Sequence, residues 1–371
     1  MKEVSYSFYI DKKCEKETKT KCGRKHICDV DLHVNAIANA IILPGDNAAR
    51  GGVLSNGKLL AQSPYLKDTN GVYEFDETDV VNSDEEVVYI GMWLDVWGHC
   101  LTDNLKHLWF LSHPEYDYLK KHKWVYSQIW SETLCESHNM WKLLRKWGVN
   151  TRNVIRIEKP TRYKRVYLAD ESFIAIKEER YYTKEFARLY DNSVIPTPKL
   201  EIPIHEKIYF SRTNWGNKDF GEKSIEDAFQ KMGYHVISPE KLELDELIYV
   251  LRHCKVLATT EGSISHNSLF LNEGTKLVLI RKAHWVNEFQ LPINEIKRLQ
   301  VTIIDSHKSV AVDKDCPWDG PFFLYCGKNL KRFAPEIEYG RFPLNSFLVY
   351  LKNTKCVKKL KRICKKLDLF G

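Results

Sequence analysis

Apolar residues follow two different spacings along the chain. Short runs are almost wholly apolar, as in strands buried on both faces, whereas longer segments repeat apolar residues every three or four positions, as in amphipathic helices. The second half of the chain is the more regular. It predicts strands at residues 207–211, 234–237, 255–258, 276–280 and 301–304, with helices at 222–232 and 244–253. Strands separated by helices of this length indicate a parallel, Rossmann-like sheet.

The first half follows the same alternation less regularly. Its predicted elements are strands at 86–91, 124–126, 154–157 and 165–168, a helix at 131–147, and a helix after Trp93 with Leu101, Leu105, Leu108, Trp109 and Leu111 on one side. Before them, residues 30–84 carry turn signals between short apolar runs, which predict an irregular region with hairpins, one of them at 52–60.

Two alternating units in 371 residues predict an α/β protein of about two domains. We expect an N-terminal Rossmann-like domain at 1–195 with an irregular, β-rich start, a second Rossmann-like domain at 196–344, and a separate tail at 345–371. Three prolines at 196, 198 and 203 mark the linker. Ligands of open parallel sheets collect at the carboxyl ends of the strands, so such a pair of domains would bind across the cleft between them.

Composition narrows the compartment. The chain is 43% hydrophobic and 28% charged, has no run approaching the ~20 apolar residues of a membrane span, and lacks a signal-peptide core at its start. Its ten cysteines are scattered, which is typical of reduced thiols in the cytosol. Cys14, Cys22, His26 and Cys28 match no paired zinc-ligand spacing, so we expect a solvated loop there and no metal.

The basic charge is concentrated at the end of the chain. Residues 345–371 contain eight lysines and arginines and one acid, Asp368, so they carry the whole net charge of +7. From Cys356 onward the apolar residues recur with helical spacing while the basic residues fill the other side. A basic amphipathic helix of this kind favours an anionic membrane surface, and the alternative is a helix packed on the body with its charges in water. A neutral body with a basic tail is unlike a nucleic-acid binder.

One turn in the second half could hold a phosphate. Glu261, Gly262, Ser263 and Ser265 follow the strand at 255–258 and precede a segment with helical spacing. A helix that begins at a glycine turn presents unpaired backbone N–H groups, to which the serine hydroxyls would add donors. The alternative is a helix end capped by Ser263 that binds nothing.

Two further motifs sit where an active site belongs. His99 and Asp103 lie one helical turn apart after the strand at 86–91, as a general base and its partner would, or as a helix-stabilising pair. Arg212 leaves the strand at 207–211 and Glu222 opens the next helix. They could clamp a diphosphate and accept from a nucleoside hydroxyl, or form an ordinary surface ion pair.

Together these segments resemble glycosyltransferase family 61. The matching pieces lie between about residues 39 and 282 and comprise His99-x-x-x-Asp103, Ser211-Arg212, Glu222 and residues 261–271. The resemblance implies a GT-B fold in which the second domain binds the nucleotide sugar and the first binds the acceptor, with inversion at the anomeric carbon and no essential metal. The donor contacts that it implies are Arg212, Glu222, Glu261, Gly262, Ser263, Ser265, His266 and Asn267.

Eukaryotic members often carry His-Gly-Ala-Gly where this chain has Glu261-Gly262-Ser263-Ile264. That turn resembles the bacterial capsular-polysaccharide branch. The hypothesis is therefore an inverting, metal-independent glycosyltransferase of surface-polysaccharide synthesis, which moves a sugar from a UDP-linked donor to a glycan or lipid-linked glycan acceptor. It needs no cofactor and lies on the inner face of the cell membrane.

Asp103 is expected as the general base with His99 orienting it, and the reverse assignment stays open. Two other functions are also compatible with the sequence. A GT-B-fold epimerase would act on the nucleotide sugar without an acceptor, and a non-catalytic scaffold would anchor a synthase complex to the membrane through the tail.

Overall fold

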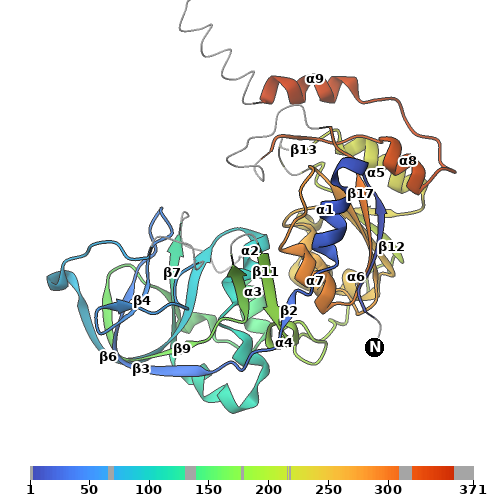
Figure 1. Cartoon of the computed structure of the whole chain (residues 1–371). Helices are drawn as coiled ribbons and strands as arrows, with labels where there is room; N and C mark the ends of the chain where they lie inside the picture. The colour runs from blue at the N-terminus through green and yellow to red at the C-terminus, as the bar shows by residue number, and fades with distance from the viewer. Residues whose placement is uncertain are drawn as a thin grey trace, which may run out of the picture. The chain divides into compact units, whose positions relative to one another are not determined.

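A computed structural model describes residues 3–65, 71–129, 139–176, 179–214, 216, 219–308 and 320–354. The chain forms two compact units. The C-terminal unit comprises Lys199–Asn287 and Lys297–Gly371 together with Met1–Arg24, and the N-terminal unit comprises Lys25–Pro198 together with Glu288–Ile296. Each unit is built on a sheet of its own (Figure 1).

The C-terminal unit contains a six-stranded sheet in the order β1-β17-β16-β15-β12-β14, with every neighbouring pair parallel. Its strands are β1 (Ser5–Tyr9), β12 (Lys207–Phe210), β14 (His235–Ile237), β15 (Val256–Thr260), β16 (Lys276–Arg281) and β17 (Gln300–Asp305). The five strands predicted in the second half are therefore confirmed. A further parallel pair joins β13 (Asp219–Phe220) to β18 (Phe322–Phe323).

The strand order places a switch point between β12 and β15. The chain runs from β12 outward to β14, then returns past β12 to β15, β16 and β17. The crossovers leaving β12 and β15 therefore diverge, which opens a crevice at the carboxyl ends of these two strands. Two predicted helices, α5 (Glu222–Lys231) and α6 (Leu244–His253), connect the strands, and α5 packs on the core around Tyr209 and Phe229.

The start of the chain packs with the C-terminal unit. β1 is the edge strand of this sheet and pairs with β17, so that Ser5 lies opposite Gln300, and α1 (Lys12–Cys22) follows it. The expected division at residue 195 grouped this segment with the first domain. Local periodicity could not show the true partner, because it lies almost 300 residues away in sequence.

The N-terminal unit contains a mixed seven-stranded sheet in the order β5-β4-β3-β9-β6-β7-β8. These strands are β3 (Val34–Leu43), β4 (Gly52–Ser55), β5 (Lys58–Leu59), β6 (Val81–Leu94), β7 (Lys123–Ile129), β8 (Val154–Arg156) and β9 (Thr161–Ala169). Four of them, β9-β6-β7-β8, are parallel as predicted. β3 pairs antiparallel with β9 and with β4, and β4 pairs with β5 in the predicted hairpin.

Shorter elements complete the two units. A three-stranded sheet joins β10 (Phe173–Ile176), β11 (Glu179–Thr183) and β2 (Ile27–Cys28). The remaining α-helices are α2 (Trp97–Leu101), α3 (Asn139–Lys146), α4 (Lys184–Arg188), α7 (Gln290–Ile296), α8 (Lys328–Phe333) and α9 (Leu344–Asn353). Short 3-10 turns are η1 (Glu77–Asp79), η5 (Thr151–Asn153) and η6 (Pro239–Lys241).

Two predicted helices differ in the structure. The segment after Trp93 is broken into α2 followed by the 3-10 turns η2 (Asp103–Leu105), η3 (Trp109–Ser112) and η4 (Pro114–Lys121). The turn at Gly262 is followed by a six-residue 3-10 helix, η7 (Ser265–Phe270), and not by an α-helix. All six of its residues are buried. Apolar spacing in this segment thus reflects burial on every side and not one face of a regular helix.

The helix predicted at 131–147 is described only over α3, and its start lies outside the described residues. The basic amphipathic stretch from Cys356 also lies outside them.

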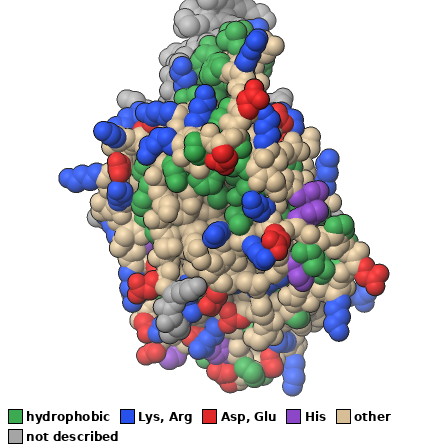
Figure 2. Space-filling model, turned by 90° about the vertical axis from the view of Figure 1, so that its right-hand side faces the viewer, with side chains coloured by type: hydrophobic (Ala, Val, Ile, Leu, Met, Phe, Trp, Pro, Cys, Tyr) green, Lys and Arg blue, Asp and Glu red, His purple; other side chains and the backbone are tan. Residues whose placement is uncertain are grey.

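The preceding helix α9 exposes Leu344, Leu348 and Val349 at 57%, 48% and 47%. Figure 2 shows hydrophobic side chains gathered at the top of its view, the part of the molecule where Figure 1 has α9. Of the helices described, none has the length and apolarity that crossing a membrane requires.

Candidate active site

Three strand ends of the C-terminal sheet bring two cations together at the switch point. Arg212 follows β12, Gly262 follows β15 and Lys282 follows β16. A Cβ atom built on Gly262 would lie 3.9 Å from Nη1 of Arg212 and 3.7 Å from Nζ of Lys282. Gly262 has a φ of +120°, a backbone conformation that residues other than glycine rarely adopt. The glycine therefore lets the backbone turn beside both cations.

Asp219 holds the two cations in place. Its Oδ2 lies 3.6 Å from Nε of Arg212, and its Oδ1 lies 3.2 Å from Nζ of Lys282. Nζ of Lys282 also lies 4.6 Å from the centre of the Phe322 ring. Burial lowers the pKa of Lys282, and neighbouring Arg212 adds to this effect while Asp219 opposes it. Two positive charges close together at the end of a parallel sheet form a site for an anionic group such as a diphosphate.

Glu222 begins α5 beside this group and is 1% exposed. The Tyr209 hydroxyl and the Arg212 backbone N–H both donate to its Oε1, over 3.0 and 3.1 Å. Its Oε2 has no hydrogen-bond partner within the described part of the chain. Burial, together with the charge of Asp219, raises the pKa of Glu222 to about 7. The carboxyl can therefore donate or accept a hydrogen bond near neutral pH.

The turn after β15 uses its polar groups differently from the prediction. Ser265 Oγ donates to the Gly262 carbonyl over 2.8 Å, and the Asn267 side-chain amide donates to the Ile264 carbonyl over 2.8 Å. These local bonds compete with a helical hydrogen-bond ladder. Ser263 does not cap η7, whose N-cap is Ile264. The structure thus contains no α-helix N-terminus that would hold a phosphate at this turn.

The other two predicted residues of the turn are buried. Glu261 and His266 are each 6% exposed. Burial raises the pKa of Glu261 to about 8; Arg281 opposes this shift and Asp305 adds to it. Sequence reasoning placed Arg212, Glu222 and Gly262 in the site but missed Lys282 and Asp219. Lys282 directly follows a predicted strand, so its position at a strand end could have been predicted from the sequence. Only the sheet order shows that this strand lies beside β15.

His99 and Asp103 lie in contact in the N-terminal unit. Nδ1 of His99 is 2.9 Å from Oδ1 and 3.0 Å from Oδ2 of Asp103. The hydroxyl of Thr102 donates to Oδ1 of Asp103 over 2.8 Å, and the Tyr65 hydroxyl lies 2.8 Å from Nδ1 of His99. The Asp103 side chain is fully buried, whereas the His99 side chain is 29% exposed. Of this pair, the imidazole is the group that can reach a substrate.

Electrostatics couple the pair. Burial alone would raise the pKa of Asp103, but the charge of His99 and hydrogen bonds from His99, Tyr65 and Thr102 outweigh burial and lower the pKa to about 2. Burial disfavours the charged form of His99, yet the carboxylate of Asp103 outweighs it and raises the pKa of the imidazole above its ordinary value. A buried carboxylate that holds one ring nitrogen leaves the other nitrogen to accept a proton.

Lys106 contacts the backbone of Tyr65, whose hydroxyl lies beside His99. Its Nζ donates to the Tyr65 carbonyl over 3.0 Å and to Glu171 over 2.7 Å, and it is 2% exposed.

Groups of three or more His, Cys, Asp or Glu side chains that could hold a metal are absent from the described ranges. Cys14 and Cys22 lie on α1 in the C-terminal unit, whereas His26 belongs to the N-terminal unit.

Part of the chain matches a known family. The chain contains a glycosyltransferase domain. Residues 97–278 match the model of the Glycosyltransferase 61 family, so this domain is a glycosyltransferase family 61 domain. The matched residues begin at α2, include His99, Asp103, Arg212, Glu222 and Gly262, and end within β16. No protein of curated function gives a significant match to the chain.

Proposed function

We propose that this protein is an inverting glycosyltransferase that moves a sugar from a nucleotide-sugar donor to a hydroxyl of a glycan acceptor. The observation that carries the proposal is the pair of cations, Arg212 and Lys282, at the switch point of the C-terminal sheet, in a chain with a family 61 domain. A nucleotide diphosphate carries negative charge when bound and gains more as it leaves. Cations placed beside it therefore stabilise the transition state more than the ground state.

Other residues of the C-terminal unit complete the donor site in this proposal. The backbone around Gly262 makes a close approach to the diphosphate possible because glycine has no side chain there. Glu222, with a pKa of about 7, hydrogen-bonds a hydroxyl or a base edge of the nucleoside through its second oxygen. Asp219 pairs with both Arg212 and Lys282 and so offsets the repulsion between the two cations. We keep a uridine nucleotide as the expected donor.

We assign the general base to His99 and not to Asp103. Asp103 is fully buried with a pKa near 2, so it stays ionised but has no access to a hydroxyl. His99 donates Nδ1–H to Asp103, and Nε2 accepts the proton of the acceptor hydroxyl. The oxygen then bonds to the anomeric carbon while the bond from that carbon to the phosphate oxygen breaks, and the diphosphate leaves with the electron pair. Asp103 stabilises the imidazolium that forms.

We further propose that the acceptor is a glycan or lipid-linked glycan of a bacterial surface polysaccharide, and that the protein meets it at the inner face of the membrane. The turn at Glu261 and the basic residues after α9 support this assignment. The described part of α9 adds an exposed apolar face with Leu344 and Leu348, and such a face next to a basic segment suits an anionic lipid surface.

A thermal-shift screen of the full chain against nucleotides and nucleotide sugars tests the proposal. A ligand that binds the folded state raises the melting temperature by mass action, so one nucleoside diphosphate series should stabilise the protein. Incubating the matching nucleotide sugar with glycan acceptors should then give a glycosidic product of inverted anomeric configuration. Interconversion of the free nucleotide sugar without an acceptor would favour an epimerase, and no nucleotide binding at all would favour a scaffold.

A further inference from the structure

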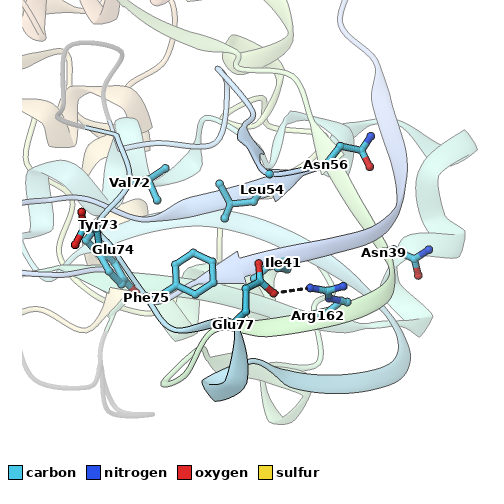
Figure 3. Close-up of a pocket in the computed structure, with 11 residues that line it drawn as sticks. Asn39, Ile41, Leu54, Asn56, Val72, Tyr73, Glu74, Phe75, Glu77 and Arg162 are labelled. Carbon is cyan, nitrogen blue, oxygen red and sulfur yellow. Dashed lines mark hydrogen bonds and ion pairs between the residues drawn. The ribbon is translucent and has the colours of Figure 1, made fainter.

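A pocket in the N-terminal unit is formed by residues that take no part in the site above (Figure 3). Strands β3, β4 and β9 and the segment at 72–77 contribute its lining. Its volume is about 610 Å³, within the roughly 300–1,000 Å³ typical of ligand sites. The pocket is thus large enough for a ligand of several rings.

His99 and Asp103 are not among the residues that line the pocket. Arg162, which lines it, pairs in register with Asn82 at the amino end of β6, whereas His99 follows the carboxyl end of that strand.

The lining combines an apolar floor with amides and one ion pair. Ile41 and Leu54 are 8% and 5% exposed and form the floor. Figure 3 shows the ring of Phe75 beside Glu77, with Leu54 across from it. Oε2 of Glu77 accepts from Nη2 of Arg162 over 3.0 Å, and both side chains are well exposed.

The charges of the lining exclude an anionic ligand. Arg162 is the single cation among the lining residues, and Glu77 neutralises it, while Glu74 adds a negative charge. A phosphate or an acidic lipid headgroup would meet net repulsion here. A wholly apolar ligand would bury the side-chain amides of Asn39 and Asn56 without hydrogen-bond partners, which is also unfavourable.

We propose that this pocket is a binding site for a neutral saccharide chain. A sugar ring presents hydroxyls at its edge and C–H groups on its face. The amides of Asn39 and Asn56 and the carboxylate of Glu77 can donate to and accept from the hydroxyls, while the Phe75 ring and the apolar floor contact the C–H face. Saccharide binding here is measured without turnover, so it stands or falls separately from the transfer reaction.

The backbone of Asn39 gives independent support. Asn39 has a φ of +53° in the interior of β3, although Ala38 and Ala40 on either side keep their register with Arg165 and Tyr163. Asn56 has a φ of +50°, but a two-residue hairpin turn requires that conformation and explains it. Asn39 lies across from Lys164, where the register of β9 with β6 also shifts, between Ser83 and Glu86. Asparagine adopts this conformation more readily than most residues, and uncommon backbone conformations are frequent at ligand-binding sites.

The test is a calorimetric titration of the full chain with three uncharged hexasaccharides, maltohexaose, cellohexaose and chitohexaose. At least one should bind with a dissociation constant in the millimolar range or tighter. Phe75→Ala should raise that constant about tenfold. Asn39→Gly should raise it too, and glycine can adopt the backbone conformation of Asn39, so this variant removes only the side chain. His99→Ala and the exposed hairpin variant Lys58→Ala should leave it unchanged.

Three results would overturn the proposal. The first is the absence of binding by all three hexasaccharides. The second is equal binding by wild type and Asn39→Gly, which keeps the fold even if Phe75→Ala does not. The third is displacement of the bound hexasaccharide by a uridine nucleotide, since that would place the saccharide at the donor site.

Discussion

Nδ1 of His99 lies 2.9 Å from Oδ1 of Asp103, and of these two side chains only the imidazole reaches solvent. This difference in exposure favours His99 for the role of base that we propose, whereas spacing alone leaves the two residues equivalent. The lowered pKa of Asp103 makes its carboxylate a poor proton acceptor. In the proposed reaction it would fix the ring and stabilise the positive charge that the ring gains.

Removal of the imidazole should therefore abolish most turnover. A general base contributes about 10²- to 10⁴-fold, so His99→Ala should lower kcat by that factor while the affinity for the nucleotide stays the same. Steady-state kinetics and nucleotide titrations measure the two effects. The matched control is His113→Ala, a histidine of the same unit that is paired with Glu185. A wild-type kcat in His99→Ala would remove this residue from the chemistry.

The Asp103→Asn variant should show its effect in the pH profile. Asp103 raises the pKa of His99 above its ordinary value of 6.5. The base must be neutral to work, so kcat/KM of the wild type should fall as the pH drops through this raised pKa. In Asp103→Asn the carboxylate charge is gone, and the acid limb should move to lower pH while the maximal rate also falls. An acid limb at the same pH in both proteins would contradict the coupling.

Arg212→Ala and Lys282→Ala should each weaken binding of the nucleoside diphosphate. Charge-assisted hydrogen bonds contribute about 1.5–3 kcal/mol, which corresponds to roughly 10- to 100-fold in the dissociation constant. Isothermal titration at low and high salt measures this loss. Lys255→Ala provides the control, because Lys255 precedes β15 at the opposite, amino end of the same sheet. Equal affinities for Lys282→Ala and wild type would show that this lysine serves only to pair Asp219.

The ion pair between Arg281 and Asp305 predicts a stability difference. The two residues lie opposite each other in β16 and β17, and Nε of Arg281 is 2.6 Å from Oδ1 of Asp305. Their side chains are 0% and 3% exposed. Asp305→Ala leaves the guanidinium buried without its carboxylate and should lower the free energy of unfolding by about 3–5 kcal/mol. Denaturant unfolding measures this change. Glu273→Ala, which breaks the exposed pair with Arg298, should cost no more than about 1 kcal/mol.

Membrane binding should depend on the basic segment and on α9 together. Deletion of residues 355–371 should reduce sedimentation with anionic liposomes, and the added substitutions Leu344→Ser and Leu348→Ser should reduce it further because they remove exposed apolar surface. Neutral liposomes and high salt supply the electrostatic controls, and Val30→Ser tests an exposed apolar residue elsewhere. Undiminished binding by the combined variant would place the membrane contact on another surface.

The sequence by itself determined the elements whose signals are local. Five strands (β12, β14, β15, β16 and β17) and two helices (α5 and α6) of the C-terminal unit fell where the apolar spacing predicted them, because a buried strand or an amphipathic helix carries its signature within a few residues. The hairpin at 52–60 followed from Asn56-Gly57 in the same way. The contact between His99 and Asp103 was also local, because the two residues are four positions apart, although α2 ends at Leu101 between them.

The tertiary structure alone decided the features that depend on distant partners. Pairing of β1 with β17, the antiparallel half of the N-terminal sheet, and the meeting of Lys282 with Arg212 across three strand ends all depend on strand order, which local spacing does not encode. The difference in solvent exposure between the side chains of His99 and Asp103 also depends on distant residues. Whether a side chain is covered depends on what packs over it, and here Tyr65, 34 residues away, closes over the pair.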